Sequence, residues 1–248
     1  MMKIENLHVK IGDNVILKGL NLELLKGKVH VVMGQNGAGK STLLKAIVGH
    51  YDVEVTDGKI TYNNKNVLEM LPEERALEGI FLSFQNPIEI PGVNNAYFLR
   101  TALNAKEKYQ GKKETNAAEF LKLMRKSIEQ LGMKPDMISR ALNDGFSGGE
   151  KKRNEILQME ILQPDVILLD EVDSGLDIDA LKAVSEGINR TKDGEKTFLV
   201  ITHYSRILDY IHPDYIHILQ DGEIVKTGGP ELVNILEEQG YQAIKKDL

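Results

Sequence analysis

The stretch Gly34-Gln-Asn-Gly-Ala-Gly-Lys40-Ser41 decides the fold of this 248-residue chain. It matches the phosphate-binding pattern G-x-x-x-x-G-K-[ST], and it lies between an apolar run at residues 29–33 and a helical stretch at residues 41–48. Its glycines let consecutive backbone N–H groups face one point, and the N-terminus of the following helix adds about half a positive charge there. The stretch therefore predicts a site for a nucleotide polyphosphate at the end of a buried strand.

Two residues of this loop have side chains that serve a phosphate and a metal. We expect the Lys40 ammonium to reach the β- and γ-phosphates and the Ser41 hydroxyl to bind Mg²⁺. A glycine turn that merely starts a helix needs neither residue, and a dinucleotide-binding pattern needs Gly in place of Thr42. The predicted nucleotide contacts of the loop are Gly34, Asn36, Gly37, Gly39, Lys40, Ser41 and Thr42.

The composition excludes several classes of protein. A hydrophobic content of 42% excludes intrinsic disorder, and a net charge of −6 with few aromatic residues argues against a nucleic-acid partner. The absence of cysteine removes disulfides, thiolate metal sites and cysteine-ligated clusters. No stretch free of Asp, Glu, Lys and Arg exceeds ten residues, whereas a membrane-spanning helix needs about 20. Since residues 1–12 lack a signal-peptide pattern, we expect a cytoplasmic protein that does not insert into a membrane.

Apolar runs and helical stretches alternate along most of the chain. Such alternation predicts an α/β fold with a mostly parallel sheet whose two faces are covered. Charged helical stretches at residues 95–109 and 115–131 predict a helical subdomain, residues 88–145, inserted into one domain of residues 1–248. The buried-strand patterns lie at residues 29–33, 80–84, 166–170, 198–202 and 215–219.

Two carboxylates, Asp170 and Glu171, follow directly on a buried-strand pattern. Ligands of open parallel sheets bind at the carboxyl ends of the strands. We therefore expect Asp170 to hold Mg²⁺, through water, and Glu171 to polarise the attacking water. A solvated strand end is the alternative, and the phosphate loop upstream argues against it.

The segment Phe146-Ser-Gly-Gly-Glu150 precedes a helical run and has the spacing of a capping box between Ser147 and Glu150. A capping box needs no glycine, and each glycine costs a helix about 1 kcal/mol against alanine. Bare backbone at a helix N-terminus suits close approach to an anion. Here the chain resembles the ATP-binding cassette family, whose signature is LSGGQ. The resemblance implies that Ser147 and Gly149 contact the γ-phosphate on a second subunit, in an ATP-dependent homodimer.

Three further motifs of the family occur in the expected order. Gln85 corresponds to the Q-loop residue that touches Mg²⁺, residues 174–177 to the D-loop, and His203 to the switch histidine on the γ-phosphate. Over residues 3–230 the resemblance implies a phosphate-loop core with an N-terminal antiparallel β-subdomain. It also implies an ATP hydrolase with catalytic Glu171, His203 and Lys40. The metal contacts it implies are Ser41, Gln85 and Asp170.

The chain departs from the family pattern at the base. The family usually stacks adenine on an aromatic residue of the first strands, and Ile11 stands at the matching position. Loss of a stacking partner costs about 1–3 kcal/mol, by analogy with nucleic-acid bases. We therefore expect modest nucleotide affinity of the monomer and loose base selectivity.

Two other departures lie in the acidic and signature segments. Val172-Asp173 replaces the usual Pro-Thr, and the signature ends in Glu150 followed by Lys151-Lys152-Arg153. The basic run is simply explained as a solvated helix face. An alternative hypothesis is that one of these cations pairs with Glu171 or Asp173 and restrains the resting monomer.

Four blocks resemble one branch of the family, the ATPases of the SUF system for iron–sulfur cluster assembly. This resemblance implies soluble SufB- and SufD-type partners, docked by the Q-loop and helical lobe at residues 85–103. With no thiols in this chain, any cluster must form on the partners. The blocks are FQNPIEIPG at 84–92, GFSGGEKKRN at 145–154, DSGLDIDAL at 173–181 and ITHYSRILDY at 201–210.

Three other functions remain as alternatives. The nucleotide motifs alone also fit the energising nucleotide-binding subunit of a membrane ABC transporter. A DNA-maintenance ATPase is disfavoured because the residues between Gln85 and Ser147 are too few for a long coiled-coil arm. A non-catalytic scaffold conflicts with the presence of every motif residue.

Overall fold

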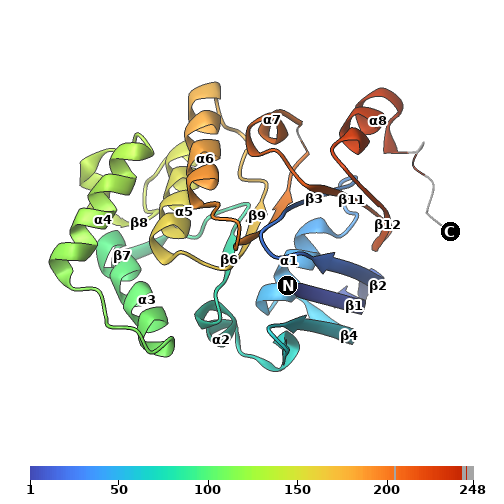
Figure 1. The fold of residues 1–248 in the computed structure, drawn as a ribbon, viewed down its shortest axis with the longest axis horizontal. Helices are drawn as coiled ribbons and strands as arrows, with labels where there is room; N and C mark the ends of the chain where they lie inside the picture. The colour runs from blue at the N-terminus through green and yellow to red at the C-terminus, as the bar shows by residue number, and fades with distance from the viewer. Residues whose placement is uncertain (204, 242–243, 245–248) are drawn as a thin grey trace.

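Five parallel strands and one antiparallel strand form the central sheet, in the order β12-β11-β3-β10-β9-β6 (Figure 1). The computed structural model describes residues 1–203, 205–241 and 244. β3, β9 and β10 are buried along their whole length, as their unbroken apolar runs predict. The strands are β3 (Val29–Met33), β6 (Ile80–Ser83), β9 (Val166–Asp170), β10 (Thr197–Ile201), β11 (Tyr215–Gln220) and β12 (Glu223–Gly228).

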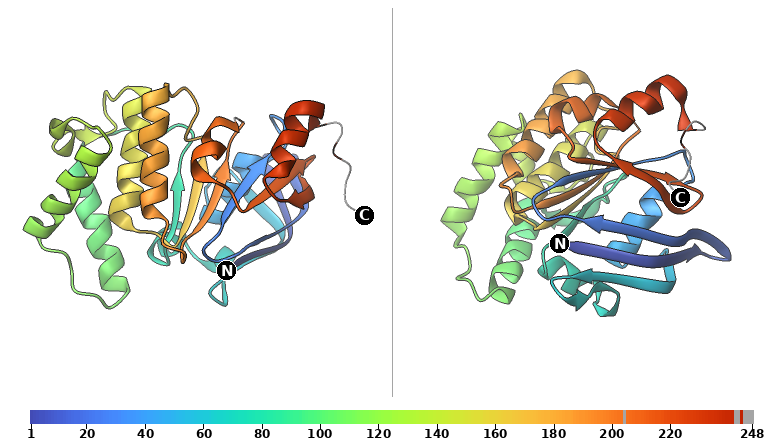
Figure 2. Two further views of the ribbon diagram at one scale, coloured as in Figure 1. Left: turned by 45° about the horizontal axis from the view of Figure 1, so that its top comes forward. Right: turned by 45° about the vertical axis from the view of Figure 1, so that its right-hand side comes forward.

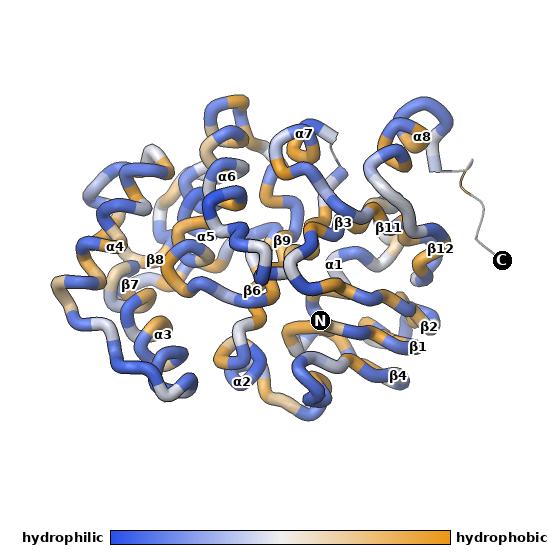
Figure 3. The backbone as a smooth tube through the Cα atoms, in the orientation of Figure 1, coloured by the Kyte–Doolittle hydropathy of each residue, from blue (hydrophilic) through white to orange (hydrophobic). Residues whose placement is uncertain are grey.

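A second, antiparallel sheet has the order β2-β1-β4-β5. Apolar and polar residues alternate along it (Figure 3), so that one face is buried and the other is exposed. The buried face, α1 (Lys40–Val48) and one face of the central sheet share one hydrophobic core, which includes Leu7, Leu43 and Leu168. The strands are β1 (Met2–Ile11), β2 (Asn14–Leu24), β4 (Glu54–Tyr62) and β5 (Lys65–Asn66).

Helices cover the other face of the central sheet. α5 (Gly148–Leu162) and α6 (Ile178–Thr191) pack on it around a second core that includes Phe198 and Ile156. α3 (Asn95–Tyr109) and α4 (Ala117–Gln130) lie beyond α5, at one end of the molecule in all views (Figures 1 and 2). The signature helix α5 therefore lies between the sheet and the outer helices.

Two short strands were not predicted. β7 (Ile90–Asn94) pairs with β8 (Ala141–Leu142), so the two ends of the chain segment that contains α3 and α4 lie side by side. Neither strand has an alternating apolar pattern, so the sequence carries no signal for them. The remaining helices are α2 (Pro72–Leu77), α7 (Leu208–Ile211), α8 (Glu231–Gln239) and three short 3₁₀ turns at Val67–Glu69, Pro135–Ile138 and Ser205–Ile207.

The predicted α/β class, with a parallel-sheet core and an antiparallel sheet, is confirmed. Most element ends agree within about two residues. α4 begins later than predicted because Thr115 donates to the Glu107 carboxylate from both its N–H and its hydroxyl, and Asn116 caps the helix instead. Among the described residues, no helix is both long and apolar enough to cross a lipid bilayer.

Candidate nucleotide site

The phosphate loop connects β3 to α1 with a backbone that only glycine adopts easily. Gly37 and Gly39 have φ of 81° and 109°, and a Cβ on Gly39 would lie 2.6 Å from Leu17 Cδ2. A Cβ on Gly34 would lie 2.3 Å from the Leu219 carbonyl oxygen. These glycines therefore fix the path of the loop against β2 and β11, and α1 begins directly at Lys40.

The Lys40 side chain folds back over its own loop. Its Nζ donates to the carbonyl oxygens of Gly34 at 2.8 Å and Gln35 at 3.0 Å. Burial lowers the pKa of this ammonium, while Asp170 and Glu171 act in the opposite direction. A phosphate is a stronger partner for a buried cation than two carbonyl oxygens, so the residue is positioned to exchange one for the other.

Ser41 and Asp170 meet at the carboxyl end of β9. Ser41 Oγ donates to Asp170 Oδ1 over 3.1 Å. Burial raises the pKa of Asp170, and the Ser41 hydrogen bond opposes that shift. A hydroxyl and a carboxylate are oxygen ligands of the kind that Mg²⁺ takes, with water and substrate phosphate completing its octahedron. The described residues contain no cluster of three or more His, Cys, Asp or Glu that could bind a metal without a substrate.

Three predicted residues from distant parts of the chain converge at this strand end. Gln85 Nε2 donates to Glu171 Oε2 at 2.7 Å, and His203 Nε2 lies 3.0 Å from Glu171 Oε1. Glu171 has φ of 47°, a left-handed conformation that is uncommon for a residue with a side chain. The backbone is held there by a hydrogen bond from Glu171 N to Ile201 O at the end of β10.

These residues share one open cavity of about 750 Å³. This is the size of a small-ligand site. Ile11 and Ile16 form its apolar end, and no Phe or Tyr of the described residues lines it. Ile16 was not among the site residues predicted from the sequence. The residues that line the cavity are Ile11, Ile16, Asn36, Gly37, Gly39, Lys40, Ser41, Thr42, Gln85, Glu171, Ser174 and His203.

Ser147 and Gly149 do not line this cavity. Ser147 Oγ accepts from Glu150 N at 3.3 Å, and the Glu150 carboxylate accepts from Ser147 N at 2.9 Å, which completes the predicted capping box. A Cβ on Gly149 would meet only Leu176 Cδ2, at 4.0 Å, and one on Gly148 would meet nothing. The N-terminus of α5 thus presents bare backbone to the outside of the molecule.

The hypothesis that one of Lys151, Lys152 and Arg153 pairs with Glu171 or Asp173 is wrong for this structure. Lys152 Nζ donates instead to the carbonyl oxygens of Phe84 at 3.1 Å and Gln85 at 2.7 Å, and none of the three cations forms an ion pair with either acid among the described residues. The buried ammonium reaches these nearer oxygens from α5. Asp173 accepts a hydrogen bond from Thr202 Oγ1 at 2.7 Å, a contact that spacing in the sequence does not reveal.

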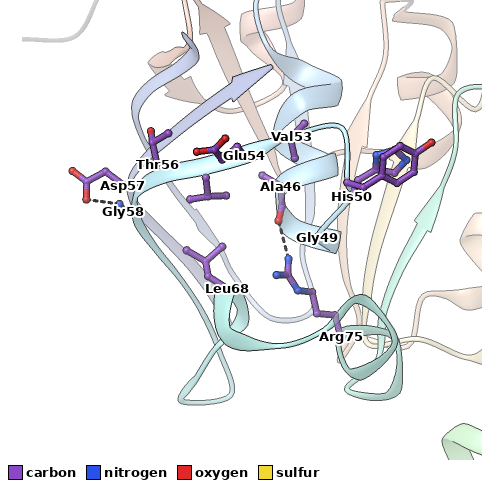
Figure 4. A pocket seen from close by; sticks show the side chains of 12 residues that line it. Ala46, Gly49, His50, Val53, Glu54, Thr56, Asp57, Gly58, Leu68 and Arg75 are labelled. Atoms are coloured by element: carbon purple, nitrogen blue, oxygen red, sulfur yellow. Dashed lines mark hydrogen bonds between the residues drawn. The ribbon is translucent and has the colours of Figure 1, made fainter. Parts of the chain in front are cut away.

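A second cavity, of about 540 Å³, lies between the end of α1 and the start of β4 (Figure 4). Its buried cation, Arg75, donates to the carbonyl oxygens of Ala46 and Ile47 at 2.9 Å each, and so satisfies the last turn of α1. Since no predicted site residue lines this cavity and its guanidinium serves the helix, we assign it a structural role.

Known proteins resemble this chain in sequence and in structure. The family model described as ABC transporter matches residues 17–174. The chain belongs to the ABC transporter family. It is 53% identical over 241 residues to "Probable ATP-dependent transporter SufC" of Escherichia coli K12, covering 97% of each chain. It is also 53% identical to "Vegetative protein 296" of Bacillus subtilis 168, over all of this chain and 94% of that one.

Solved structures share the fold of this cassette. A dimeric cassette named MJ0796 has a TM-score of 0.78 at 23% identity, covering 92% of this chain and 98% of that chain. A nucleotide-free ATP-binding cassette has a TM-score of 0.76 at 25% identity, covering 98% of both. The predicted family, its SUF-type resemblance and an ABC-type ATPase activity are thereby confirmed.

Proposed function

We propose that this cassette hydrolyses Mg–ATP in a transient head-to-tail homodimer and so drives conformational change in SufB- and SufD-type partners during iron–sulfur cluster assembly. The observation that carries the proposal is the convergence of Gln85 and His203 on Glu171, beside the Lys40 and Ser41 of the phosphate loop. The 53% identity to SufC supports the choice of partners. We propose the cytoplasm as the compartment.

Each residue of the cavity has a proposed task. Backbone N–H groups from Gly37 to Thr42 and the Lys40 ammonium bind the phosphates. Ser41, Asp170 and Gln85 hold Mg²⁺, which when bound neutralises phosphate charge and polarises the γ-phosphoryl group. Glu171 orients the attacking water in line with the γ-phosphorus, and His203 donates a hydrogen bond to the charge that develops there.

Two side chains of the site already have partners in this structure. Both oxygens of Glu171 have a partner in this structure, and both acceptors of Lys40 belong to its own loop. Each carboxylate oxygen has two lone pairs, so Glu171 can accept a hydrogen bond from water while Gln85 and His203 hold its orientation. An arriving γ-phosphate supplies a negatively charged partner for Lys40, whose present acceptors are neutral carbonyl oxygens, and a further acceptor for His203.

The proposed dimer follows from the position of Ser147 and Gly149. Their helix N-terminus suits an anion, but they do not line the cavity of their own chain. A second copy, placed head-to-tail, would bring this N-terminus over the γ-phosphate and exclude water from it. The MJ0796 cassette, which shares this fold, is dimeric, and this supports the arrangement.

Residues 88–145 are proposed as the inserted subdomain that meets the partners. Ile88 follows Gln85 by three positions and Tyr97 lies in the first turn of α3, and they are 57% and 70% exposed. Large exposed apolar side chains of this kind are typical of interfaces. Because this chain has no cysteine, ligands for a cluster must come from the partners.

A co-purification experiment tests the proposal. The chain is expressed with SufB- and SufD-type proteins from one source and with a panel of permease subunits, and ATPase activity is measured for each complex. We expect a stable complex with the SUF proteins and a higher ATPase rate within it. The relatives are also named transporters, so binding to a permease alone would favour the alternative, an energising transporter subunit.

A further inference from the structure

Two side chains of the signature helix α5 form hydrogen bonds with the backbone of the Gln85 loop. Lys152 Nζ donates to the carbonyl oxygens of Phe84 and Gln85, at 3.1 and 2.7 Å. One turn further on, Glu155 Oε2 accepts from Phe84 N at 3.2 Å. The two side chains are only 5% and 4% exposed. Together they satisfy both polar groups of Phe84 and the carbonyl of Gln85.

The same helix also contacts the rest of the Q-loop segment, which we define as residues 84–95. Hydrogen bonds of buried Asn side chains connect α5 to this segment. An exposed ion pair joins α5 to the middle of the segment. These contacts are Asn95 Nδ2 to Asn154 Oδ1 at 2.8 Å, Asn154 Nδ2 to Asn143 Oδ1 at 2.8 Å, Asn143 Nδ2 to Ile88 O at 2.8 Å, and Lys151 Nζ to Glu89 Oε1 at 2.5 Å.

We propose that Lys152 and Glu155 are positioning residues for Gln85, which fasten the Q-loop segment to α5 so that Gln85 and the Ser147 end of the signature helix move as one body. Neither residue lines the nucleotide cavity. They act through the backbone of Phe84 and Gln85. This inference rests on the roles proposed above for Gln85 and Ser147.

Burial of Lys152 and Glu155 makes the attachment costly in free energy to break. A buried ammonium and a buried carboxyl each lose much free energy if they are left without partners. The Q-loop backbone supplies partners to both at once, and Gln158 Nε2 also donates to Glu155, at 3.1 Å. Movement of Phe84 away from α5 would leave several buried polar atoms unsatisfied. Displacing the Q-loop segment as a unit with α5 keeps them all.

The attachment lies close to the groups that we assign to catalysis. Gln85 Nε2 lies 2.7 Å from Glu171 Oε2, and Ser147 is only five positions from Lys152 along the chain. A displacement of about 1 Å in a positioned group costs a reaction up to about a hundredfold in rate. A partner that presses on the Q-loop segment would therefore shift the Glu171 contact and the helix N-terminus together.

Hydrogen exchange of the nucleotide-free chain tests the attachment itself. Glu155→Ala removes the acceptor of Phe84 N, whereas Glu155→Gln keeps an oxygen there. We expect at least tenfold faster exchange over residues 84–95 in Glu155→Ala and near wild-type exchange in Glu155→Gln. Peptides from β9 report global unfolding in the same experiment. Glu160→Ala is the matched control, because Glu160 is a buried acid of the same helix that pairs with Arg190 instead.

Steady-state kinetics test the functional part. We expect Glu155→Ala to lower kcat about tenfold or more with KM for ATP within about threefold, and Glu155→Gln to restore kcat. Glu155→Ala combined with Gln85→Ala should lower kcat no further than Gln85→Ala alone. If Glu155→Ala does not fold, Lys152→Met and Lys152→Arg give the same comparison from the other partner.

Each outcome has one meaning. Unchanged exchange of residues 84–95 in both Glu155→Ala and Lys152→Met overturns the proposal, as does equal kcat for the alanine and glutamine variants. If Gln85→Ala itself leaves kcat unchanged, the role proposed for Gln85 fails, while the exchange data still decide whether the attachment exists.

Discussion

Gln85 Nε2 donates a hydrogen bond to Glu171 Oε2 over 2.7 Å, although the two residues are 86 positions apart in the chain. His203 holds the other carboxylate oxygen at 3.0 Å. The carboxylate that we assign to the attacking water is therefore engaged on both sides in the isolated chain. This relationship links Gln85, which follows β6, to Glu171, which follows β9, and to His203, which follows β10.

Glu171→Gln should separate ATP binding from hydrolysis. The amide still accepts from Gln85, but it attracts the water proton far less than a carboxylate does. We expect ATP turnover to fall at least about a hundredfold and a dimer with two bound ATP molecules to accumulate. Light scattering with Mg–ATP and single-turnover hydrolysis measure the two effects.

Glu186→Gln is the control for that experiment, because Glu186 is an exposed acid on α6. It should leave both turnover and oligomeric state unchanged. A Glu171→Gln variant that stays monomeric, alone and with SUF partners, would contradict the dimer mechanism.

The core of the site could be predicted because its motifs sit at strand ends. Lys40, Glu171 and His203 follow β3, β9 and β10, which are neighbours in the sheet, so their carboxyl ends must meet. Apolar runs fixed the strands, and the glycine pattern fixed the loop between β3 and α1. These patterns come from residues close together in the sequence, so they do not depend on tertiary packing.

The partners of the buried charges could not be predicted. Lys152 lies on α5 with carbonyl oxygens and three carboxylates at the same strand edge, and helical periodicity alone does not choose among them. Glu155 is 4% exposed although charged residues usually lie at the surface. Its role depends on the backbone of Phe84, 71 positions away, and tertiary packing alone brings them together.

Ile11→Tyr should strengthen nucleotide binding by the monomer. Ile11 lines the apolar end of the cavity and is 39% exposed, so a ring there can cover one face of a base. Stacking on an aromatic ring is worth about 1–3 kcal/mol, which predicts at least about fivefold tighter ATP binding. Calorimetry with ATP and GTP measures the change. The wild-type chain should bind both within about fivefold, since no Phe or Tyr of the described residues lines the cavity.

Val15→Tyr provides the comparison for the base site. Val15 lies on the facing strand β2, is 51% exposed and does not line the cavity. It should leave the affinity unchanged. Strong rejection of GTP by the wild-type monomer would show that another contact reads the base.

Acid should unfold this chain through a buried histidine pair. Leu25 N donates to His30 Nε2, so His30 Nδ1 carries its proton and donates to His217 Nε2 at 3.0 Å, and His217 Nδ1 donates to Thr227 Oγ1. Burial lowers the pKa of His30 to about 4 and of His217 to about 3. Between the ordinary value of 6.5 and these values, only the unfolded state takes up protons, so stability falls as the pH falls.

We expect the free energy of unfolding to drop by roughly 5 kcal/mol between pH 7 and pH 4.5 because of this pair. Urea titrations at several pH values measure it. A His30→Gln, His217→Gln double variant should lose that part of the pH dependence. An identical pH profile for the variant and the wild type would assign the acid sensitivity to other groups.

Gly149→Ala should impair dimer formation without harming the fold. The added methyl would approach no atom of its own chain closer than Leu176 Cδ2 at 4.0 Å, and alanine favours a helix by about 1 kcal/mol over glycine. The unfolding free energy should therefore stay constant or rise slightly. In the proposed dimer, the same methyl would stand between the α5 backbone and the γ-phosphate of the second copy. We expect loss of the ATP-dependent dimer and about a tenfold or greater fall in turnover, measured by light scattering and phosphate release.

Gly148→Ala adds the same methyl one position earlier, where it would also meet no atom of its own chain, and it should have the smaller effect. Equal losses from the two variants would place the phosphate contact elsewhere on this helix N-terminus.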